Sequence, residues 1–111
     1  MSGPGEPAIA ASVNRALWGE ISPRVRSVQF EIGPRQIRLR FFFDGLPNAA
    51  DLDSMGCVGA EVAADFPGRS VNEEAIATEA TADLPRGDDW HVAYARKEAS
   101  LTSRRQRHPA I

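Results

Sequence analysis

The sequence predicts an α+β fold in which two helices cover one face of a four-stranded antiparallel sheet. Residues 27–32 and 36–43 alternate apolar and polar side chains, as half-buried strands do. Residues 48–65 repeat large apolar side chains at helical spacing. One more helix before these segments and two more strands after them give the order α-β-β-α-β-β. At 111 residues the chain can build one two-layer core, which we expect over residues 7–98.

The first helix is expected to begin at Pro7, because proline lacks the N–H that would be unpaired in a first helical turn. Gly19 is a suitable residue to end it. We expect residues 1–6 and 99–111, which lack a periodic apolar pattern, to be disordered tails. The apolar positions that recur at helical spacing are Ile9, Val13, Ala16 and Leu17.

The next two segments form a predicted β-hairpin around a turn at Gly33 and Pro34. Arg38, Arg40 and Phe42 lie on the opposite face of the second strand. Because Phe42 interrupts that polar face, we expect the face to be partly covered. The apolar side chains of the two strands are Val28, Phe30 and Ile32, followed by Ile37, Leu39, Phe41 and Phe43.

The second helix is predicted to begin after Asn48, a good capping residue, and to end before Pro67. Asp51 and Asp53 lie in its first turns, where the helix dipole favours negative charge. A neighbouring stripe of small residues is expected to let the first helix approach closely, and consists of Cys57, Ala60 and Ala64. The large stripe expected to cover the sheet consists of Leu52, Met55, Val58, Val62 and Phe66.

Residues 70–81 are predicted to be a strand, and Trp90, Val92 and Tyr94 alternate with small or polar residues in a last strand that ends at Arg96. We expect these two strands to form a second hairpin, which makes the sheet antiparallel throughout. Trp18 and Trp90 are expected to be core or rim aromatics.

The charge of the chain is segregated along the sequence. Residues 44–89 hold eleven acidic and two basic side chains, whereas both flanking segments are basic; the whole chain has a net charge of −2. A concentrated acidic surface attracts and holds a basic partner.

No catalytic or metal-binding motif competes with this interpretation. The single cysteine and two histidines do not have the spacing of a zinc site, so we expect neither metal nor cofactor. A small hydrolase that uses Glu61 and Asp65, or a Cys57–His91 pair, remains an alternative.

Four stretches of the sequence share a pattern with a known group of proteins: Leu17–Pro23, Phe41–Gly45, Cys57–Pro67 and Trp90–Glu98. Together they resemble small bacterial immunity proteins of contact-dependent growth-inhibition systems. The resemblance covers roughly residues 15–98, and the block from Cys57 to Pro67 is its most specific part.

This resemblance implies a non-enzymatic inhibitor that binds a toxin domain, often a nuclease, and blocks it. A nuclease is basic where it meets phosphates, so an acidic inhibitor surface could imitate its substrate. Charge and helical phase, rather than the resemblance, select the expected partner-binding residues: Asp51, Asp53, Glu61, Asp65, Glu73 and Glu74.

A self-associating domain of other function, with the acidic segment of one copy against a basic segment of another, is a second alternative. We expect a cytoplasmic protein without a membrane partner, because the sequence has no apolar run of about 18 residues and no secretory signal. We also expect no nucleic-acid partner, because the basic stretch Ser103–His108 is short and lacks interleaved aromatic residues.

Overall fold

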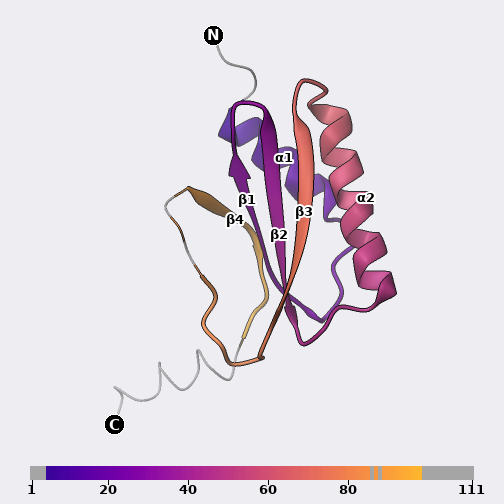
Figure 1. The fold of residues 1–111 in the computed structure, drawn as a ribbon, viewed down its shortest axis with the longest axis vertical. Coiled ribbons are helices and arrows are strands. Elements are labelled where there is room, and N and C mark those ends of the chain that lie inside the picture. The colour runs from indigo at the N-terminus through magenta and orange to yellow at the C-terminus, as the bar shows by residue number, and fades with distance from the viewer. Residues whose placement is uncertain (1–4, 86, 88, 99–111) are drawn as a thin grey trace.

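The computed structural model describes residues 5–85, 87 and 89–98, which form two helices and four strands in the predicted order (Figure 1). The first helix starts one residue earlier than predicted, and the expected disorder of residues 1–4 and 99–111 lies outside the described residues. The elements are α1 (Glu6–Ala16), β1 (Val25–Ile32), β2 (Gln36–Asp44), α2 (Ala49–Asp65), β3 (Ser70–Thr78) and β4 (Trp90–Ala95).

Strands β1 and β2 form the predicted antiparallel hairpin. Ile32 pairs with Ile37 beside the turn, and the Gly33 N–H donates to the Gln36 carbonyl at 2.8 Å. The prediction of a hairpin from alternation and a Gly-Pro turn is therefore confirmed.

The prediction of an entirely antiparallel sheet is wrong. Strand β3 pairs in parallel with β2, β4 pairs antiparallel with β1, and the strand order is β3-β2-β1-β4. Helix α2 returns the chain along the sheet, so the strand that follows it runs in the same direction as the strand before it. The last two strands consequently occupy opposite edges of a mixed sheet and form no hairpin with each other.

The connection from β3 to β4 has to pass from one edge of the sheet to the other, and it covers part of the face that lacks helices. The Gln29 side chain, which lies on that face, donates from Nε2 to the Pro85 carbonyl at 3.1 Å. The Arg40 guanidinium lies 3.8 Å from the centre of the Trp90 ring and 5.2 Å from that of Phe42. Phe42 is fully buried, so the expected cover on this face is confirmed.

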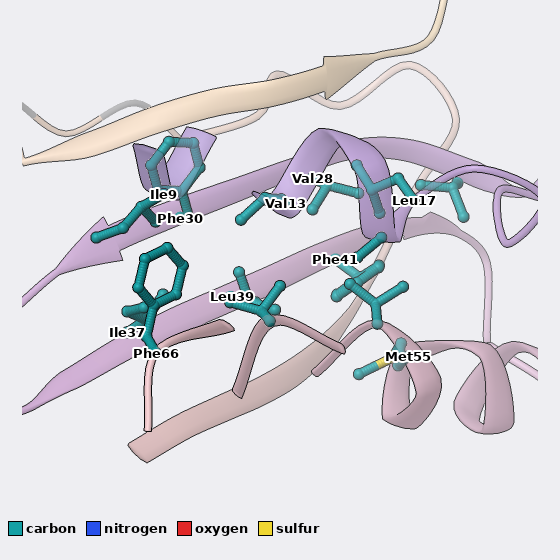
Figure 2. Close-up of a cluster of buried hydrophobic side chains, with 14 of the residues drawn as sticks. Ile9, Val13, Leu17, Val28, Phe30, Ile37, Leu39, Phe41, Met55 and Phe66 are labelled. Carbon is teal, nitrogen blue, oxygen red and sulfur yellow. The ribbon is translucent and has the colours of Figure 1, made fainter. Parts of the chain in front are cut away.

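Both helices pack on the other face of the sheet around one apolar core (Figure 2). Ile9 and Phe66 lie toward one end of this core, and Leu17 and Met55 toward the other, so α1 and α2 run antiparallel. Leu52, however, is 49% exposed, which corrects its assignment to the sheet-facing stripe. The buried apolar residues are Ile9, Val13, Ala16, Leu17, Val25, Val28, Phe30, Ile37, Leu39, Phe41, Phe43, Met55, Val58, Val62 and Phe66.

Candidate functional site

The N-terminus of α2 is held by a reciprocal capping box. The Asn48 side chain accepts from the Asp51 N–H at 2.8 Å, and the Asp51 carboxylate accepts from the Asn48 N–H at 2.9 Å. The same carboxylate accepts from Ser22 Oγ at 3.2 Å and forms an ion pair with Arg24 Nε at 3.1 Å. Asp51 is 6% exposed, so this predicted partner-binding residue is used inside the fold.

Asp65, near the C-terminus of α2, joins the two helices. Its Oδ2 accepts from Ser12 Oγ at 2.6 Å and lies 2.6 Å from Arg15 Nη2. The hydrogen bond from Ser12, together with the Arg15 charge, lowers the pKa of the Asp65 carboxyl. Its charge is therefore partly compensated, although the side chain remains 41% exposed.

Asp53 and Glu61 lie on the outer side of α2 and are exposed. Within the described ranges, no residue forms an ion pair with either of them. We call their side of the helix the acidic α2 face; it comprises Asp53, Cys57, Ala60, Glu61 and Ala64, all of which are exposed. The predicted contact of Cys57, Ala60 and Ala64 with α1 is therefore wrong.

Glu73 lies on the helix-covered side of β3, against α2. A Cβ added at Gly59 would overlap the Glu73 carboxylate, so the glycine makes room for this side chain. Partial burial raises the pKa of Glu73. Its ionised form is therefore less favourable in the folded protein than in the unfolded chain.

Replacing Glu73 with glutamine is expected to stabilise the protein at pH 7. A raised folded-state pKa contributes stability that is present below the usual glutamate value of 4.5 and is lost as pH rises through the folded pKa. The difference in free energy of unfolding between Glu73→Gln and wild type should thus grow above pH 4.5. Urea unfolding from pH 4 to pH 8 measures this, with Glu61→Gln, on the outer side of α2, as the control. A difference that does not change with pH would contradict the assignment.

Glu74 points away from Glu73, to the face that lacks helices. It pairs in register with Arg40 of β2, and its charge acts on the Arg40 guanidinium. The six predicted carboxylates therefore do not form one cluster. Asp53 and Glu61 share the acidic α2 face, whereas Asp51 is buried and Glu74 lies on the opposite face of the sheet.

The groups proposed for a hydrolase are not arranged as a catalytic pair. Cys57 is exposed on α2, whereas the centre of the His91 ring lies 5.1 Å from that of the Phe30 ring and His91 Nδ1 lies 3.4 Å from Glu6 Oε2. No hydrogen bond joins Cys57 to His91, and Asp65 is bonded to α1 rather than to Glu61. Among the described residues, no group of three or more acidic, cysteine or histidine side chains could hold a metal ion.

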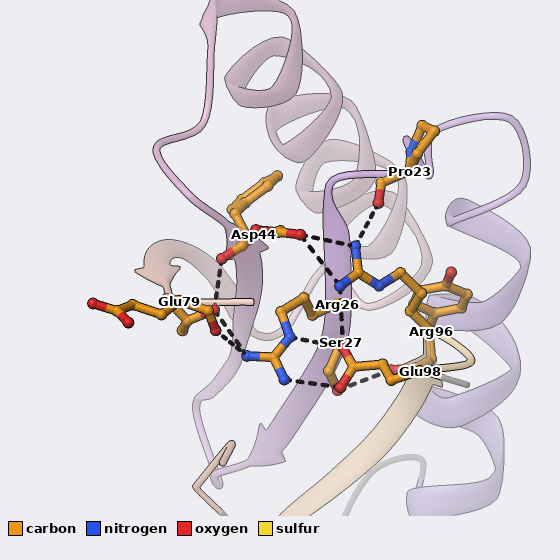
Figure 3. Close-up of polar contacts among 10 residues, drawn as sticks. Pro23, Arg26, Ser27, Asp44, Glu79, Arg96 and Glu98 are labelled. Atoms are coloured by element: carbon orange, nitrogen blue, oxygen red, sulfur yellow. Dashed lines mark hydrogen bonds and ion pairs between the residues drawn. The ribbon is translucent and has the colours of Figure 1, made fainter. Parts of the chain in front are cut away.

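A buried polar network at the end of the sheet where β1 begins and β3 and β4 end escaped the sequence analysis (Figure 3). Arg26 of β1 is 2% exposed; its Nε and Nη2 donate to the two oxygens of Glu98 at 2.7 and 2.8 Å. Its Nη1 donates to Thr78 Oγ1 and to the Glu79 carbonyl at 3.1 and 2.9 Å. Arg96 lies 3.3 Å from Glu98 and 3.4 Å from Asp44.

This network joins the ends of β3 and β4 to β1. It therefore holds these strands together within the sheet and does not present a ligand site. The sequence signal for this network was Arg26, a charged residue between Val25 and Val28. The strand that contains it is buried along most of its length. A second feature that the prediction missed is Trp18, which is 84% exposed instead of lying in the core or at its rim.

Within the described ranges, neither helix has the length and apolar character needed to cross a bilayer.

Comparison with solved structures supports the fold. A chain from the complex of tri-AMPylated Shewanella oneidensis HEPN toxin with MNT antitoxin matches with a TM-score of 0.51 and 12% identity, over 94% of this chain and 89% of that chain. At this identity the likeness concerns the fold alone. No curated protein sequence matches this chain significantly.

Comparison with protein families gives a match over nearly all of the described chain. The model of the MafI2 immunity protein family aligns with residues 6–98, which include all the helices and strands of the described residues. The match confirms the resemblance to immunity proteins, although the family is of the Maf type and not one specific to contact-dependent growth inhibition. The chain belongs to the MafI2 immunity protein family.

Proposed function

We propose that this protein is a non-enzymatic inhibitor that binds a basic toxin domain through the acidic α2 face. Membership of an immunity protein family is the observation that carries the proposal. The solved complex with a similar fold contains an antitoxin bound to a toxin, which agrees with this role.

The exposed carboxylates of Asp53 and Glu61 support the choice of surface. Both are without an ion pair in the described part of the chain, so their charge is available to a partner. Asp51 and Asp65, in contrast, are engaged by Arg24 and Arg15. We therefore keep Asp53 and Glu61 as the principal partner-binding residues, with Glu73 beside α2 as an additional contact.

A nuclease is the toxin class that this surface suits best. A nuclease active site needs cationic side chains to hold phosphates, and an acidic helix face can occupy the same cations. Long-range attraction between the two surfaces would also accelerate association. We place the encounter in the cytoplasm of the cell that makes the inhibitor.

Charge reversal on the acidic α2 face is expected to slow toxin binding. The double variant Asp53→Lys/Glu61→Lys should lower the association rate constant for a cognate toxin domain by about tenfold or more. Both residues are exposed, so the variant should fold normally. Surface plasmon resonance or stopped-flow fluorescence measures the rate.

The control for this experiment must change the net charge equally at another place. Asp83→Lys/Asp89→Lys does so in the exposed connection between β3 and β4, away from the acidic α2 face. Equal slowing by both double variants would indicate an effect of net charge alone and would contradict the proposed surface.

A further inference from the structure

The most exposed large apolar side chain in the described part of the molecule is Trp18. It is 84% exposed, although tryptophan is usually well buried in folded proteins. At protein interfaces, tryptophan is enriched among the few residues that contribute most of the binding energy. An isolated exposed indole is therefore a candidate contact residue, provided that its position suits a partner.

The backbone around Trp18 is fixed by local hydrogen bonds. The Trp18 N–H donates to the Arg15 carbonyl at 3.2 Å, and the Glu20 N–H donates to the Leu17 carbonyl at 3.0 Å. Gly19 supplies the positive φ of 79° that the turn requires. Because the indole is carried by an ordered turn, a partner would not have to order this backbone on binding.

Two side-chain bridges place this turn along α2. Upstream of Trp18, Ser12 and Arg15 bond to Asp65 near the end of α2. Downstream, Ser22 bonds to Asp51 in the first turn of α2. Trp18 lies between these bridges in the sequence, so the segment that carries it runs beside α2, along the side of Asp51 and Asp65. Glu61 of the acidic α2 face lies one helical turn before Asp65.

We propose that Trp18 is the apolar anchor of the toxin-binding surface and that it enters an apolar pocket bordered by cationic side chains on the toxin domain. This inference rests on the proposed function. The carboxylates of Asp53 and Glu61 complement a cationic partner surface, and the small side chains of the acidic α2 face let that surface come close. The same partner thus meets both an indole and uncompensated carboxylates.

Replacing Trp18 with alanine is expected to weaken binding of the toxin domain by about 30-fold or more. Trp18→Phe should recover part of the affinity, because an aromatic ring remains to fill the pocket. Leu46→Ala is the matched control: Leu46 is 78% exposed, lies in the connection before α2, and should bind as wild type does. Isothermal titration calorimetry gives the affinities, and thermal unfolding verifies that each variant is folded.

The outcomes separate this inference from the proposed function. A wild-type protein that fails to bind the toxin domain would overturn the proposed function, and this inference with it. Wild-type binding that is unchanged in Trp18→Ala would overturn the anchor while leaving the proposed function intact. Dimerisation of the isolated protein that is lost in Trp18→Ala, seen by sedimentation, would assign the indole to a second copy and overturn the toxin as its occupant.

Discussion

Replacing Glu98 with alanine is expected to lower the free energy of unfolding by about 3 kcal/mol. The change leaves the Arg26 guanidinium, which is 2% exposed, without the carboxylate that accepts two of its hydrogen bonds. An uncompensated buried charge is among the costliest single defects in a small domain. Denaturant unfolding of the variant and of wild type at pH 7 measures the loss.

A double-mutant cycle shows whether the loss of stability in Glu98→Ala comes from the interaction between Glu98 and Arg26. Arg26→Met/Glu98→Ala removes both charges, so its destabilisation should be smaller than the sum of the two single losses. The hydrogen bonds from Arg26 lower the pKa of the Glu98 carboxyl. A lowered folded-state pKa contributes stability that is present above the usual glutamate value of 4.5 and is lost as pH falls. The deficit of Glu98→Ala should therefore shrink in acid. Additive losses would show that the pair is not coupled.

Replacing Asp51 with alanine is expected to destabilise the protein by about 2–3 kcal/mol. The variant loses the capping box of α2, the ion pair with Arg24 and the hydrogen bond from Ser22. Asp51→Asn should lose less, because an amide oxygen can still accept from the Asn48 N–H. Thermal and urea unfolding measure both variants.

Asp53→Ala provides the matched control for Asp51, since both carboxylates lie near the start of the same helix. Asp53 is exposed and takes no part in the capping box, so its replacement should change the free energy of unfolding by less than about 0.5 kcal/mol. Equal effects of the two substitutions would contradict the structural role of Asp51.

The first hairpin and α2 could be predicted from the sequence because their signals are local. Alternation from Val28 to Phe43 gives two strands, and the Gly33–Pro34 turn joins them. Asn48 begins α2 as its capping preference indicates. Each signal lies within a few residues of the structure it specifies.

The partner of β3 could not be derived from neighbouring residues alone, because it depends on where α2 returns the chain. A strand that follows a crossover helix runs parallel to the strand before that helix, so β3 pairs with β2. Strand β4 then pairs with the free edge of β1. The prediction that β3 and β4 form a hairpin relied on their closeness in the sequence. The crossover through α2 determines the strand pairing instead.

Which carboxylates are exposed and which are engaged by other side chains also depends on residues that are distant in the sequence. Helical phase placed Leu52 inside and Asp51 outside, but Ser22 and Arg24 compensate the Asp51 carboxylate and allow it to be buried. In the same way, Ser12 and Arg15 engage Asp65. Charge counts along the chain predict an acidic segment, whereas only the tertiary contacts show which charges remain available.

The dependence of toxin affinity on salt tests the central claim most directly. If the acidic α2 face holds a cationic toxin domain, the dissociation constant for wild type should rise steeply between low and high ionic strength, because salt screens exposed charges over about 10 Å at 0.1 M. Asp53→Lys/Glu61→Lys should flatten or invert that dependence. An affinity that does not respond to salt, or the same response in wild type and variant, would contradict the account.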